Sequence, residues 1–140
     1  MSSIINKAII QKTSIPVLKR MLDLSSLRHK LIASNVANVT TPGYKSKSID
    51  FDAELRKALK PEHMKVTTTH PGHIPLRSSK ASPPKVKVAE ETDESNGVNS
   101  VDIDREMGDL AQNQLVYELA AKLAGNKFKA LKSAIRGRPL

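Results

Sequence analysis

An apolar heptad pattern in the C-terminal part of the sequence constrains the fold of this chain more than any other feature. Apolar side chains recur at alternating spacings of four and three residues, from position 103 to position 135, over more than four heptads. This spacing places them on one seam of a long helix that packs against other helices. Nine of the ten positions are apolar or aromatic; the seam is Ile103, Met107, Leu110, the polar exception Gln114, Tyr117, Ala121, Ala124, Phe128, Leu131 and Ile135.

The same helix carries a second apolar line on a neighbouring face, which allows contact with more than one partner helix. That line consists of Val116, Leu119, Leu123, Ala130 and Ala134. Acidic residues near the start of the helix and basic residues near its end match the preference of the helix dipole. The first seam can be buried against a helix of the same chain or against other copies and relatives. The presence of two seams favours a multi-chain assembly.

A second amphipathic helix is predicted from about residue 16 to about residue 38, where leucine, isoleucine and valine recur at spacings of three and four. Pro16 suits the first turn of such a helix. The pattern ends at Thr41-Pro42-Gly43-Tyr44, because Pro42 lacks an amide donor and Gly43 permits a positive φ. Pro-Gly at the centre of four residues predicts a type II turn.

The central part of the chain is predicted to be extended over 45–50 and to form one short helix over 51–59. Five of the eight prolines lie between 60 and 96, and residues 80–97 are predicted to be a mobile linker. The chain therefore divides into an N-terminal core helix region (1–40), a central segment (41–97) and a C-terminal coiled-coil helix (98–140).

Composition supports helices and limits the partners. Only 39% of the residues are apolar and 3% aromatic, so the packing must come mainly from Leu, Ile, Val and Ala. The net charge of +9 is compatible with anionic partners, but a solvated basic surface is the favoured explanation. Nucleic acid is not expected as a partner, because the four aromatic residues are not interleaved with the basic ones. The absence of cysteine excludes disulfides and thiolate metal sites.

Residues suited to catalysis or metal binding are few and poorly arranged. His70 and His73 are separated by Pro-Gly, which denies them a helical scaffold, and no further histidine follows. Ser82 and Lys85 have the spacing of some acyl-transfer enzymes but lie among prolines. The acids at 102 and 104 lack the glycine and glutamate of a calcium loop and mark a helix start. We therefore expect no enzyme activity, no cofactor, no metal and no small-molecule substrate.

The start of the sequence does not predict a targeting segment. Its apolar runs of two or three residues are broken by Asn6, Lys7, Gln11 and Lys12, unlike the core of a signal peptide. No run approaches the roughly 20 apolar residues of a membrane span. Export, if it occurs, is expected to follow a route without a cleaved leader.

One motif is specific enough to indicate a family. The N-terminal signature of the bacterial flagellar axial proteins, the rod and hook group, is a helix ending in SN-x-AN that leads into TPGY. This chain resembles that signature in two adjacent stretches, Ala33-Ser34-Asn35-Val36-Ala37-Asn38 and Thr40-Thr41-Pro42-Gly43-Tyr44-Lys45. The length, and the stretches 69–75, 99–107 and 112–117, resemble the proximal rod members of that group.

The resemblance implies a mainly α, elongated subunit, with N- and C-terminal helices paired as a coiled coil and a small irregular, β-containing central segment. Such subunits are exported through the flagellar type III apparatus and stack helically in the rod, in the cell envelope on the periplasmic side. The implied partners are other copies of the chain, other proximal rod proteins, the rod-base adaptor FliE, and the membrane ring and export gate. In this comparison, Asn35 and Asn38 either cap the last helical carbonyls or bond across a subunit contact.

The alternative hypothesis is a soluble helical adaptor that binds one partner through the same coiled coil. An open polymer should grow with concentration, whereas an adaptor complex should keep a fixed mass.

Overall fold

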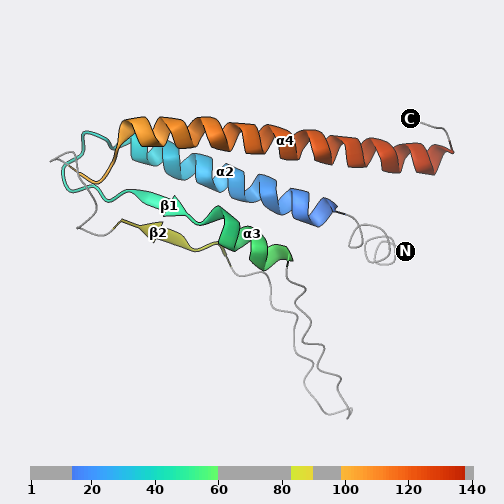
Figure 1. Cartoon of the computed structure of the whole chain (residues 1–140), viewed down its shortest axis with the longest axis horizontal. Coiled ribbons are helices and arrows are strands. Elements are labelled where there is room, and N and C mark those ends of the chain that lie inside the picture. Colours follow the sequence, from blue (N-terminus) through green and yellow to red (C-terminus); the bar gives the residue numbers. More distant parts are fainter. Residues whose placement is uncertain (1–13, 60–82, 90–98, 138–140) are drawn as a thin grey trace, which may run out of the picture.

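The computed structural model describes residues 14–59, 83–89 and 99–137. These ranges form α2 (Ile15–Ala37), β1 (Lys47–Ile49), α3 (Phe51–Leu59), β2 (Val86–Val88) and α4 (Ile103–Arg136). Figure 1 shows α2 in the middle, with α4 along one side and β1 and α3 along the other. The predicted mainly helical fold, with paired terminal helices and a small β-containing centre, is confirmed.

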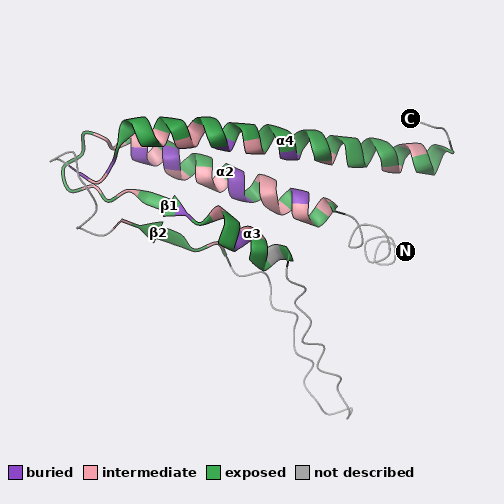
Figure 2. Cartoon of the chain, in the orientation of Figure 1, coloured by how far each residue is buried: buried purple, intermediate pink, exposed green. Residues whose placement is uncertain are grey.

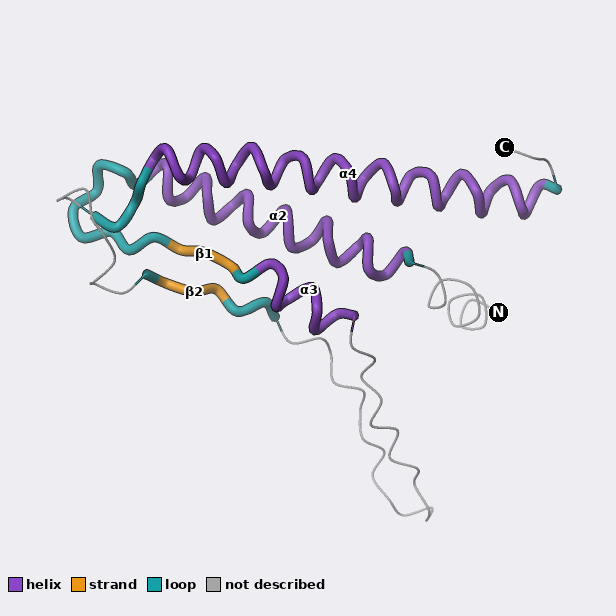
Figure 3. The backbone as a smooth tube through the Cα atoms, in the orientation of Figure 1, coloured by secondary structure: helices purple, strands orange, loops and turns teal. Residues whose placement is uncertain are grey.

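The two long helices run antiparallel, as the path of the backbone shows (Figure 3). The polar contacts agree with this direction, because later residues of α4 contact earlier residues of α2. Asn35 bonds to Glu106, Arg28 to Asp109 and Ser25 to Asn113. With 23 residues in α2 and 34 in α4, the last turns of α4 continue past the first described turn of α2 (Figure 1).

The ends of α4 are set by local chemistry. The Asp102 carboxylate accepts hydrogen bonds from the backbone amides of Asp104 and Arg105, at 3.0 and 3.2 Å, and so caps the first turn. Gly137 ends the helix with a φ of +64°, in the left-handed region that favours glycine. The acids at the start of this segment therefore serve the helix terminus, as predicted.

The apolar core is small and lies mainly on α2. Leu18, Leu24 and Ile32 are buried on α2, whereas Ala120 is the only buried apolar residue on α4. Figure 2 shows this asymmetry, because buried positions are frequent along α2 and rare along α4. Much of the surface of α4 is therefore left without a partner in the described part of the chain.

The structure corrects the prediction of a mobile linker at residues 83–89, whereas the rest of the predicted range 80–97 lies outside the described residues. Residues 83–89 are described, and Val86–Val88 forms β2, which pairs antiparallel with β1. Lys47 lies opposite Val88, Ser48 opposite Lys87 and Ile49 opposite Val86. Two β-branched residues with a lysine between them favour a strand, but the neighbouring prolines and the acidic run masked that preference.

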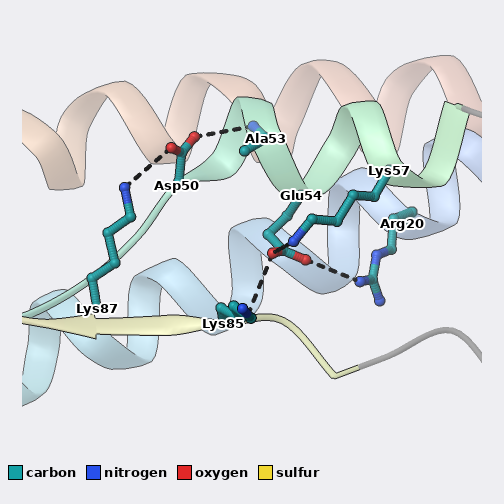
Figure 4. Close-up of polar contacts among 7 residues, drawn as sticks. All are labelled: Arg20, Asp50, Ala53, Glu54, Lys57, Lys85 and Lys87. Atoms are coloured by element: carbon teal, nitrogen blue, oxygen red, sulfur yellow. Dashed lines mark hydrogen bonds and ion pairs between the residues drawn. The ribbon is translucent and has the colours of Figure 1, made fainter.

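Helix α3 is held against α2 and β2 by a buried carboxylate. The Glu54 side chain is only 4% exposed and lies 3.8 Å from the Arg20 guanidinium, within reach of Lys57 and of the backbone amide of Lys85 (Figure 4). The hydrogen bond from Lys57 lowers the pKa of Glu54 below its ordinary value. Asp50, which accepts from the Ala53 amide and from Lys87, fixes the start of α3 next to β2.

Candidate functional site

The predicted turn between α2 and β1 has the expected geometry. The backbone amide of Tyr44 donates to the Thr41 carbonyl at 3.3 Å, and Gly43 has a φ of +69°. This positive φ is what a type II turn requires at its third residue. Thr41, Pro42 and Gly43 are exposed and Tyr44 is half-buried, so the turn directs the chain from the end of α2 into β1.

Replacement of Gly43 by Val is expected to destabilise the turn and to lower the number of assembled structures that contain the chain. A Cβ at this position would meet nothing within 4 Å, so the cost is backbone strain alone, about 1 to 2 kcal/mol. Gly43→Asn is the matched control, because asparagine tolerates a positive φ better. The measurement is the free energy of unfolding of the purified chain, together with a count of assembled structures. Equal stability of the Val and Asn variants would contradict this explanation.

Asn35, in the centre of the family motif, connects three elements. Its side-chain amide donates to the Lys47 carbonyl at 2.9 Å and to the Glu106 carboxylate at 2.8 Å. Its oxygen accepts from the Lys47 amide at 2.9 Å and from the Tyr44 hydroxyl at 3.3 Å. Only 1% of Asn35 is exposed, so it ties α2 to β1 and α4 inside one chain.

Asn38 has the capping role that the sequence left open. Its amide donates to the Ser34 carbonyl at 2.7 Å in the last turn of α2, and its oxygen accepts from the Thr41 hydroxyl. Ser34 in turn lies 3.1 Å from the Tyr44 hydroxyl, through the two side-chain oxygens. Ala37, the remaining motif residue, is exposed. The motif therefore specifies the end of α2 and the turn that follows.

The sequence predictions did not single out Asn99, which closes this junction from the other end of the chain. Its side-chain amide donates to the carbonyls of Asn38, Val39 and Thr41, at 3.1, 2.6 and 3.1 Å. The residue is 4% exposed. A polar residue next to a turn-rich stretch carries no periodic signal, so only the three-dimensional contact reveals its role.

The carboxyl group of Glu106 lies at the edge of the same junction. Its burial raises its pKa above the ordinary value, and the hydrogen bond from Asn35, which favours the charged form, acts in the opposite direction. Asp109 nearby adds to the increase. The junction of Asn35, Asn38, Tyr44, Asn99 and Glu106 therefore holds a partly buried negative group next to a fully bonded amide.

The predicted heptad seam lies mostly on the free surface of α4. Seven of its ten residues are exposed and none is buried. Phe128 is 58% exposed, Met107 51% and Ile135 84%. The exposed members are Ile103, Met107, Gln114, Tyr117, Ala121, Phe128 and Ile135, and the half-buried members are Leu110, Ala124 and Leu131.

A neighbouring heptad line makes the contact with α2. Glu106, Asn113 and Ala120 are spaced by seven residues, and of these Asn113 and Ala120 are buried and Glu106 is half-buried. Leu115, Leu119 and Leu123 add further exposed apolar area to α4. Helix α4 thus has one heptad line that packs against α2 and two apolar lines that are largely exposed.

Comparison with known proteins identifies the family. No protein-family profile matches the sequence. The chain is 36% identical over 124 residues to the flagellar basal body rod protein FlgB of Borreliella burgdorferi, covering 84% of this chain and 91% of that protein. The chain belongs to the FlgB family of flagellar basal body rod proteins. FlgB of Salmonella typhimurium is 31% identical, with coverages of 83% and 88%, and FlgB of Bacillus subtilis is 30% identical, with coverages of 86% and 91%.

Membership of the FlgB family makes this chain a structural subunit of the flagellar basal body rod and does not favour the adaptor alternative. His70, His73 and Ser82 lie outside the described residues. Among the residues that the structure describes, no group of three or more His, Asp or Glu side chains could hold a metal ion. Within the same ranges, no helix combines the length and hydropathy of a membrane span.

Proposed function

We propose that this FlgB-family chain is a subunit of the proximal rod and that it assembles helically through its terminal helices. The observation that carries the proposal is the exposed apolar surface of α4. Large apolar side chains exposed along one helix mark an interaction surface. The members of this surface on the predicted seam and the second line are Ile103, Met107, Tyr117, Leu119, Leu123, Phe128 and Ile135.

The proposed role is structural and non-enzymatic, and the proposed three segments keep their predicted bounds of 1–40, 41–97 and 98–140. Partners are other copies of the chain and other proximal rod proteins, with FliE, the membrane ring and the export gate at the rod base. The rod lies on the periplasmic side of the envelope. The names of the relatives support the rod location and leave the individual neighbours to experiment.

The direct test is structural. In cells whose only copy of this gene encodes an epitope-tagged chain, basal bodies are purified and imaged by electron cryomicroscopy with antibody labelling. The tag is expected at the base of the rod, and deletion of the gene is expected to remove rods and motility. Label on a soluble complex of fixed mass, with normal rods, would support the adaptor instead.

Phe128→Ala tests the exposed surface of α4 at one residue. The free energy of unfolding of the free chain should change by no more than about 0.5 kcal/mol, because the phenyl ring is exposed in the free chain. In the rod, loss of an enclosed phenylalanine should remove roughly 3 to 5 kcal/mol of packing. Lys129→Ala is the adjacent control and should cost little. The measurement is the number of basal bodies relative to the level of exported subunit, compared between the two variants. Equal counts for both variants would contradict burial of Phe128.

A further inference from the structure

The small sheet of β1 and β2 has two outer edges, and Asn35 closes one of them at Lys47. The side chain of Asn35 donates to the Lys47 carbonyl and accepts from the Lys47 amide, both at 2.9 Å. These two backbone groups of β1 point away from β2, so Asn35 takes the place of a further strand there. Because β1 lies between α2 and β2, the second strand is on the outside of the molecule (Figure 1).

The hydrogen bonds of the sheet show where the backbone groups of β2 point. The Ala89 amide donates to the Ser46 carbonyl at 2.8 Å, so this pair bonds across the two strands. In an antiparallel pair, such residues alternate with residues whose N–H and C=O groups point away from the partner strand. The N–H and C=O groups of Val86 and Val88 therefore point away from β1 and form the open edge of β2. Within the described ranges, these groups have no hydrogen-bond partner.

The side chains along the open edge are exposed and are of two kinds. Val86 and Val88 project on one face of the sheet and are 42% and 52% exposed. Lys87 projects on the other face, and Lys85, one residue before β2, is exposed as well. The Lys87 Nζ lies 3.2 Å from the Asp50 carboxylate, whereas Lys85 has no ion pair within the described part of the chain. The open edge therefore combines exposed apolar side chains with an excess of positive charge.

The open edge matches one kind of partner better than others. Its donors and acceptors have the spacing of a strand, so they pair with the backbone of another extended polypeptide. The β2 strand of a second copy is a poor match, because pairing of Val86 with Val88 puts Lys87 opposite Lys87, and like charges directly opposite are destabilising. An acidic residue opposite Lys87, between two apolar residues that cover the valines, replaces this repulsion by attraction.

We propose that the open edge of β2 binds an extended acidic segment of a partner protein, which adds to the sheet as a third strand. The backbone of this segment bonds to the outward groups of Val86 and Val88, and its apolar side chains cover these two valines. Its acidic side chains pair with Lys85 and Lys87. The open edge and α4 lie on opposite sides of α2, so the inference goes beyond the proposed assembly through α4 (Figure 1).

The first test uses a capped synthetic peptide, Thr-Val-Glu-Val-Glu-Val-Thr, as the probe. It is titrated into the purified, isotopically labelled chain and followed by nuclear magnetic resonance. The amide signals of Val86 and Val88 are expected to shift and their hydrogen exchange to slow, because both amides become donors in a ladder. The same peptide with lysine in place of both glutamates is the control and should bind about tenfold more weakly, because it brings like charges together.

The second test removes one donor of the open edge. Val88→Pro lacks the outward N–H but keeps the bonds between β1 and β2, because proline is tolerated where the amide of an edge strand points outward. It is expected to bind the acidic peptide about three- to tenfold more weakly, the effect of one lost hydrogen bond. Val88→Thr, which keeps both the amide and the β-branched shape, is the matched control and should bind nearly as wild type does.

Lys85→Gln tests the charge without touching the backbone, and it should narrow the difference in affinity between the two peptides. Three results would overturn the proposal: unchanged Val86 and Val88 signals at millimolar peptide, equal binding of both peptides, or equal binding by Val88→Pro and Val88→Thr. Protection of the same two amides when the chain alone is concentrated would also overturn it, because the occupant of the open edge would then be a second copy.

Discussion

Aspartate at position 120 is expected to unfold the free chain, whereas aspartate at position 121 is expected to leave it folded and to prevent rod assembly. Ala120 is 0% exposed in the contact between α2 and α4. An unpaired carboxylate there should cost about 3 kcal/mol or more. Ala121, its neighbour, is exposed on the predicted seam, so the same charge stays in water until another subunit covers it.

The two variants form a matched pair, because the substitution is identical and the positions are adjacent. Circular dichroism and thermal melting of the purified chain measure the first effect, and counts of basal bodies with export controls measure the second. A folded Ala120→Asp chain would show that α2 and α4 do not pair as described. Normal rods with Ala121→Asp would exclude the predicted seam as the assembly surface.

Asn35→Asp is expected to destabilise the junction strongly at neutral pH. The new carboxylate loses the two donations to Lys47 and Glu106 and stands where the amide was 2.8 Å from the Glu106 carboxylate. A carboxylate at this position, which is only 1% exposed, is a buried charge without a counter-charge and should cost about 3 to 5 kcal/mol. Asn38→Asp is the control. It loses the capping hydrogen bond to the Ser34 carbonyl, but among the described residues Asn38 has no hydrogen bond to a carboxylate. We therefore expect the free energy of unfolding to fall by only about 1 kcal/mol.

The pH dependence of Asn35→Asp provides a second signature. Burial already raises the pKa of Glu106, so the folded state holds its proton at a higher pH than the unfolded state does. A second carboxylate raises the pKa of the pair further. Such a group contributes stability at low pH, which is lost as the pH rises through the folded pKa. The deficit of Asn35→Asp relative to wild type should therefore shrink as the pH falls from 7 toward about 4 to 5. A deficit independent of pH would contradict this account.

Local signals predicted the helices well. The bounds of α2, α3 and α4 follow from proline, aspartate and glycine at their ends and from apolar spacing within them, all of which act over a few residues. Strand β2 was not predicted, because its partner β1 lies far away in sequence and its own three residues give a weak signal. Pairing between distant segments is set by the tertiary fold and not by local propensity.

The surface of α4 shows a different limit of prediction. Its sequence contains neighbouring heptad lines, and periodicity alone does not say which one faces α2. The predicted seam is the more apolar, yet the line of Glu106, Asn113 and Ala120 makes the internal contact. The polar members of that line are matched by partners on α2, Asn35 and the Ser25 carbonyl, which no pattern within α4 could reveal.

The four hydrogen bonds of Asn35 have a mechanical consequence for a part that rotates. The hydrophobic driving force depends on the apolar area buried and has no directional preference, so it opposes separation of two helices more than it specifies their orientation. Hydrogen bonds weaken steeply when their angle changes, so they resist sliding and twisting. Asn35 is hydrogen-bonded to β1, to Tyr44 and to α4 at once, so it connects the paired long helices to the central segment. Sliding of the long helices relative to the central segment requires these hydrogen bonds to break, so we expect Asn35 to couple the two parts of the subunit under torque.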